Sequence, residues 1–107
     1  MSDRHDAAKR IADVIIERGY TNPFGGDVSR STNAKGKTRY VTDFSLPAVL
    51  DGTVEVFSSG FILVRARGKR APFGDFSAVY GSVDDAIAAV CCICEGEHSE
   101  LELIKTR

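Results

Sequence analysis

The chain has 107 residues, a net charge of −1 at pH 7 and a hydrophobic fraction of 43%. This length suits one domain with a single core, the apolar content excludes disorder along the whole chain, and the near-zero charge argues against strong non-specific binding to nucleic acid. No apolar run approaches the roughly 18 residues that cross a bilayer, and the N-terminus lacks the apolar segment of a signal peptide. We therefore expect one domain over residues 1–107, no membrane partner and a cytoplasmic location.

The first expected element is a helix from about Ser2 to Arg18. Ser2 is a suitable N-cap, and Gly19 is placed to end the helix. The apolar residues that repeat at helical spacing and predict one buried face are Ala8, Ile11, Ala12 and Ile15. The segment 21–36 that follows is dense in turn formers without an apolar period, so it predicts a long loop.

Four strands joined by short connections are predicted next, and such an order is most simply an antiparallel meander. The expected strand ranges are 37–46, 53–57, 61–67 and 75–80. Asp51 and Gly52 form a turn-prone pair and are expected to lead into the second strand as a turn.

The central hairpin is set by a short loop of Ser58, Ser59 and Gly60. A three-residue loop that ends in glycine suits a type I turn followed by a left-handed bulge residue, and it places Phe57 opposite Phe61. The strand period of two then puts Val54, Val56, Ile62 and Val64 on one face of the hairpin. The other face carries Thr53, Glu55, Phe57, Phe61, Leu63, Arg65 and Arg67. A two-residue loop would instead pair Phe57 with Ile62, and this second face would not exist.

A second helix is expected from about Ser82, because Ser82 and Asp85 approximate a capping box. Residues 86–94 are apolar on every side, which indicates burial on more than one side, and Gly96 is placed to end the helix. Residues 97–107 are expected either as a flexible tail or as a fifth, edge strand.

The predicted fold class is α+β: an N-terminal helix, a four-stranded antiparallel meander sheet, a C-terminal helix and this fifth edge strand, with both helices packed on the face that carries Val54.

A partial phosphate-binding motif occurs at Gly36, Lys37 and Thr38, since a P-loop ends in Gly-Lys-Thr. That loop also requires a glycine at position 31, which is Ser31, and a helix after the motif, where a strand is expected here. The motif therefore predicts a turn at the start of a strand and no nucleotide cofactor.

Three cysteines, Cys91, Cys92 and Cys94, precede His98 and invite a metal hypothesis. Zinc sites usually take a second ligand pair from another element, and no second Cys or His pair exists in the chain. We expect buried thiols in a reducing compartment, no metal, no catalytic residues and no enzymatic activity.

The remaining candidate sites combine aromatic and basic side chains. The predicted interaction surface comprises Phe57, Phe61, Leu63, Arg65 and Arg67. A basic edge and loop comprises Arg30, Lys35, Lys37, Arg39, Lys69 and Arg70.

The leading hypothesis is a non-enzymatic interaction module that forms a homodimer or binds a partner protein through the open sheet face. The alternative is a module that stacks single-stranded nucleic acid on the aromatics and neutralises its phosphates with the cations. The sequence leaves open which sheet face the helices cover.

Overall fold

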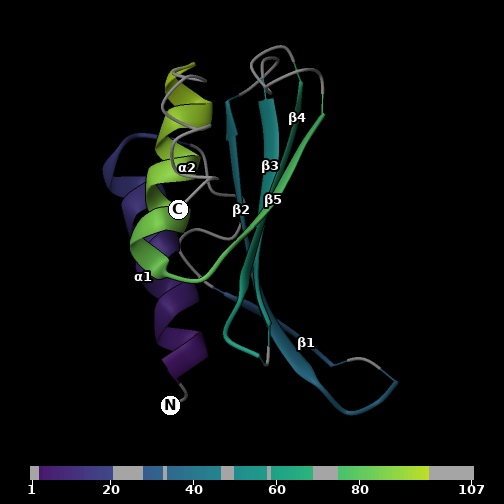
Figure 1. Ribbon diagram of the computed structural model, residues 1–107. Helices are drawn as coiled ribbons and strands as arrows, with labels where there is room; N and C mark the ends of the chain where they lie inside the picture. Colours follow the sequence, from purple (N-terminus) through teal and green to yellow (C-terminus); the bar gives the residue numbers. More distant parts are fainter. Residues whose placement is uncertain are drawn as a thin grey trace.

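The computed structural model describes residues 3–20, 28–32, 34–46, 50–57, 59–68 and 75–96. The elements in chain order are α1 (Asp3–Glu17), β1 (Ser29–Thr32), β2 (Thr38–Leu46), β3 (Leu50–Val56), β4 (Ile62–Gly68), β5 (Asp75–Tyr80) and α2 (Val83–Glu95). The five strands form one sheet in the order β1-β2-β3-β4-β5, and each neighbouring pair is antiparallel. Both helices lie on the same side of this sheet (Figure 1). The predicted α+β fold class is therefore confirmed.

The helix α1 buries the face that its apolar spacing predicts. Ala8, Ile11, Ala12 and Ile15 are each no more than 1% exposed. Gly19 adopts a φ of 82°, a left-handed conformation that ends the helix, and the N–H of Tyr20 donates to the carbonyl of Ile15 at 3.0 Å. No helix within the described ranges is long and apolar enough to cross a membrane.

The central hairpin has the register that the three-residue loop requires. Val56 pairs with Ile62, and the N–H of Phe57 donates to the carbonyl of Phe61 at 2.9 Å. The N–H of Gly60 donates back to the carbonyl of Phe57 at 2.9 Å, and Gly60 has a φ of 93°. This register excludes the two-residue alternative, in which Phe57 would pair with Ile62.

The strand β3 begins earlier than predicted, because Asp51 and Gly52 belong to the strand and do not form a turn. Gly52 pairs with Phe44 on one side and with Ala66 on the other. A Cβ atom at position 52 would overlap the ring of Phe44, so the aromatic ring occupies the space above the glycine. The turn propensity of the Asp-Gly pair yields here to the packing of a fully buried phenylalanine.

The strand β1 lies inside the segment that was predicted as a loop. Its sequence Ser-Arg-Ser-Thr has no apolar alternation, because an edge strand with exposed residues needs none. It pairs with β2 from Ser29 opposite Val41 to Thr32 opposite Thr38. β1 is therefore the strand that the sheet has in addition to the four predicted ones. The other strand that was expected, in the tail at residues 97–107, lies outside the described residues.

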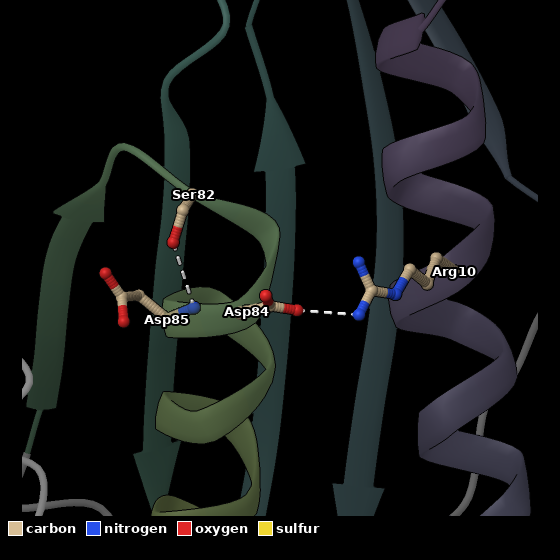
Figure 2. A network of polar contacts seen from close by, with 4 residues as sticks. All are labelled: Arg10, Ser82, Asp84 and Asp85. Atoms are coloured by element: carbon tan, nitrogen blue, oxygen red, sulfur yellow. Dashed lines mark hydrogen bonds and ion pairs between the residues drawn. The ribbon is translucent and has the colours of Figure 1, made fainter.

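The core lies between the two helices and the face that carries Val54, as predicted. Val54, Val56, Ile62 and Val64 are each no more than 1% exposed. The helix α2 begins at the N-cap Ser82, whose Oγ accepts from the N–H of Asp85 at 3.2 Å (Figure 2). Since both helices cover this face, the opposite face of the sheet has no helix of the described residues over it (Figure 1).

Candidate interaction surface

The face of β2 to β5 turned away from the helices is called the open face. The strand register arranges its side chains in four rows across the strands. From the loop between β3 and β4 to the opposite end, the rows are Arg39, Phe57 and Phe61; Val41, Glu55, Leu63 and Val79; Asp43, Thr53, Arg65 and Ser77; and Ser45, Asp51, Arg67 and Asp75. The five residues of the predicted interaction surface all lie on this face.

One end of the open face, the apolar end, consists of Val41, Phe57, Phe61, Leu63 and Val79. Phe61 is 54% exposed and Val79 is 57% exposed. Leu63 pairs with Val79 and is half-buried. Val41, Leu63 and Val79 belong to β2, β4 and β5, and the two phenylalanines flank the loop between β3 and β4, so the patch depends on the sheet as a whole. An apolar cluster of this kind on an uncovered sheet face is typical of a contact surface.

Glu55 lies at the centre of the open face and is only 7% exposed. Its carboxylate forms ion pairs with Arg39, at 3.3 Å from Nη1 to Oε1, and with Arg65, at 3.9 Å from Nη2 to Oε2. Within the described part of the chain, Oε2 has no hydrogen-bond partner. Glu55 therefore holds two guanidinium groups beside the apolar end and offsets one of their two charges.

Sequence reasoning did not select Glu55 as a site residue. The signal for it was available in the strand pattern, since a glutamate in a central strand needs cationic partners on the same face if it is covered. The register places Arg39 and Arg65 diagonally across from it on the two neighbouring strands.

The other end of the open face, the charged end, is a depression of about 690 Å³. Its charged lining residues are Asp43, Asp51, Asp75, Arg65 and Arg67. Hydroxyl groups of Ser45, Thr53 and Ser77 also line it. In the register, Arg67 lies between Asp51 on β3 and Asp75 on β5, so both charge signs alternate across the strands.

Burial raises the pKa of Asp43, and the negative charge of Asp51 raises it further, while a hydrogen bond from Thr53 works in the opposite direction. Asp43 is thus a carboxylate that is partly removed from water. In the described ranges, no group of three or more His, Cys, Asp or Glu residues has a geometry that could hold a metal ion. The charged end combines carboxylates, guanidinium groups and hydroxyl-bearing residues.

The three cysteines lie on α2 and are buried free thiols. Burial raises the pKa of the Cys91 thiol, with Glu95 acting in the same direction and Arg18 opposing it. A protonated, covered thiol is a poor nucleophile, so this cluster contributes packing. His98 lies outside the described residues.

The structure describes four of the six residues of the predicted basic edge and loop. Arg30, Lys35, Lys37 and Arg39 belong to the hairpin of β1 and β2, and all four are exposed. Lys69 and Arg70 lie outside the described residues. Arg39 joins this group to the open face through its ion pair with Glu55.

No protein-family model, curated protein or solved structure matches the chain.

Proposed function

We propose that the protein is a non-enzymatic interaction module that self-associates or binds a partner protein through the open face of its sheet. The observation that carries this proposal is the position of both helices on a single face, so that neither α1 nor α2 covers the apolar end. Phe61 and Val79 are each more than half exposed although they belong to the most apolar residue types. Covering them with a partner removes apolar area from water, at roughly 25 cal/mol per Å².

A second copy of the chain is a suitable partner because the rows of the open face are complementary to themselves. Two sheets pack face to face about 10 Å apart with their strands nearly aligned. A two-fold axis along the strands, in the plane between the sheets, lays the apolar end on the apolar end and the charged end on the charged end. Asp51 of one copy then lies near Arg67 of the other, and the reciprocal pair forms at the same time.

The size of this face sets the expected strength of association. Four strands at a spacing of about 4.8 Å, each about six residues long at 3.3 Å per residue, give a footprint of roughly 400 Å² per copy. A stable complex usually buries about 800 Å² per partner. Association is therefore expected to be weak, so it must be measured at high micromolar concentration.

The substitution Phe61→Asp tests the proposal by placing a charge in the middle of the apolar end. The side chain is 54% exposed, so the fold is expected to tolerate the change. Light scattering at high micromolar concentration should show a dimer for the unmodified protein and a monomer for the variant. Ile16→Asp is the matched control, since Ile16 is 45% exposed on α1 and lies away from the open face.

A strict monomer at high micromolar concentration, unchanged by Phe61→Asp, would remove the self-association version and leave only an unlike protein partner. A loss of the dimer in the Ile16→Asp control as well would remove the open face as its site.

The alternative function, a platform for single-stranded nucleic acid, has less support from the geometry of this face. Phe57 and Phe61 do lie in the same row as Arg39, and Arg65 lies two rows away on the same face, so aromatic and cationic side chains share this face as stacking on bases requires. Both guanidinium groups, however, share the carboxylate of Glu55. Three further carboxylates line the charged end, so the open face is nearly balanced in charge and a polyanion gains little from it.

A further inference from the structure

The hairpin of β1 and β2 carries a concentration of positive charge that the open face does not use. Residues 28–40, called here the basic arm, include Arg30, Lys35, Lys37 and Arg39 and contain no acidic residue. All four cationic side chains are exposed. The tip of the arm extends beyond the helices and the other strands (Figure 1). The charge is therefore carried on a projecting two-stranded ribbon.

The charge of the arm contrasts with that of the rest of the molecule. The whole chain has a net charge of −1, and four positive charges on the arm leave a net charge of −5 for all other residues. A polyanion is therefore attracted by the arm and repelled by the remainder, which orients its approach.

The cations point to both faces of the ribbon. Arg30 pairs with Tyr40, while Arg39 pairs with Ser31, so the alternation of a strand directs Arg30 and Arg39 to opposite faces. Lys35 and Lys37 lie in and beside the turn at the tip. A flat acidic surface of a protein would contact only one face of this ribbon. A groove with phosphates on both walls contacts both.

The other side chains of the arm favour phosphate over bases. Hydroxyl groups donate readily to phosphate oxygens, and the arm presents Ser29, Ser31, Thr32 and Thr38. The one aromatic residue in the sequence of the arm is Tyr40, and its ring is half-buried and packs edge-on against His5, so it is not presented for an unpaired base to stack on. The major groove of B-form DNA is about 12 Å wide and admits a two-stranded β-ribbon, whereas that of A-form RNA is too narrow.

We propose that the basic arm binds double-stranded DNA by entering a groove and contacting the phosphates of both strands, without reading the base sequence. Arg39 is shared with Glu55, so three to four phosphate contacts are expected. Each contact contributes about −0.9 to the slope of log K against log salt, which predicts a slope of about −2.7 to −3.6. Affinity should then fall about 40-fold to 150-fold over a fourfold rise in salt concentration.

Fluorescence anisotropy with a labelled DNA duplex of mixed sequence at low salt tests this proposal on the full chain. The double variant Lys35→Ala/Lys37→Ala should bind more than tenfold more weakly, and its salt slope should be shallower by about 1.8. The matched control is Lys9→Ala/Arg18→Ala, which removes the same charge from α1 and from the turn that follows it. The control should keep the slope of the unmodified protein, and thermal melting should show both variants folded.

Three results would overturn the proposal. The first is no binding of the duplex at low salt. The second is an equal loss in the control pair, which would make the effect one of net charge alone. The third is binding of a labelled single strand or of polyglutamate at least as tight as that of the duplex, which would assign the arm to a different polyanion.

Discussion

At the scale of single residues, the contact of Gly52 with Phe44 determines how β2 and β3 pair. Gly52→Ala would push a Cβ atom into the ring of Phe44, which is fully buried among close-packed neighbours. We expect the free energy of unfolding to fall by about 1–3 kcal/mol, as for other overpacked cores. Urea denaturation measures this change.

Gly81→Ala is the control for this substitution, because an added Cβ at position 81 has no atom within 4 Å and the backbone needs no positive φ. Its effect should stay within about 0.5 kcal/mol. Equal denaturation midpoints for the two alanine variants would contradict the packing argument.

The carboxyl group of Asp43 predicts a pH dependence. Its pKa is raised chiefly by burial, so the folded state binds the proton more tightly than the unfolded state does. At neutral pH the ionised group therefore lowers stability, and this cost disappears as the pH falls through the raised pKa. Asp43→Asn should stabilise the protein at pH 7 by less than about 1 kcal/mol, since the site is partly exposed.

The stabilisation by Asp43→Asn should shrink as the pH is lowered toward the ordinary aspartate pKa of about 3.9. Urea denaturation of both proteins across this range measures the trend. A difference in stability that stays constant with pH would show that burial does not affect the ionisation of Asp43.

At the scale of elements, the start of α2 depends on its N-cap. Ser82 Oγ accepts from the N–H of Asp85, and Asp84 pairs with Arg10 of α1 at 2.6 Å (Figure 2). Ser82→Ala should lower the free energy of unfolding by about 1 kcal/mol, and Ser82→Asp should restore most of it. Arg10→Ala should cost less, because both partners of this ion pair are largely exposed. Thermal and urea denaturation would rank the variants, and a larger loss from Arg10→Ala would contradict this order.

Glu95, at the end of α2, contacts the residues that follow the end of α1. Tyr20 donates its hydroxyl to Oε1 of Glu95 at 3.1 Å, and Nη1 of Arg18 lies 3.4 Å from the same oxygen. Burial and the acceptor Glu95 raise the pKa of the Tyr20 hydroxyl, so it stays protonated and remains a donor over the ordinary pH range. Polar contacts at both ends thus set how α1 and α2 lie against each other.

At the scale of the whole molecule, one arrangement of layers separates two surfaces of different chemistry. The helices and the sheet enclose the core, the open face combines apolar residues with balanced charges, and the basic arm projects from one edge of the sheet. The two proposed contacts involve different residues apart from Arg39, so Phe61→Asp and Lys35→Ala/Lys37→Ala should act independently. A protein contact through the open face leaves the arm accessible.

The sequence by itself determined the elements whose residues carry a strong local pattern. Helical spacing and caps located α1 and α2, and a loop of three residues that ends in Gly60 determined the register of the central hairpin. That register already placed Phe57, Phe61, Leu63, Arg65 and Arg67 on one face, because alternation along a strand is a property of the backbone.

Only the tertiary structure decided the features that depend on contacts between distant segments. β1 has no apolar pattern of its own and exists because β2 offers it hydrogen bonds, while Asp51 and Gly52 join β3 because the ring of Phe44 packs over the glycine. The burial of Glu55 between two arginines likewise follows from pairing across three strands. The apolar pattern predicted that the helices cover the face carrying Val54. The choice of this face, and so of the open face, depends on the burial of residues summed over every element, and no local stretch of sequence contains that sum.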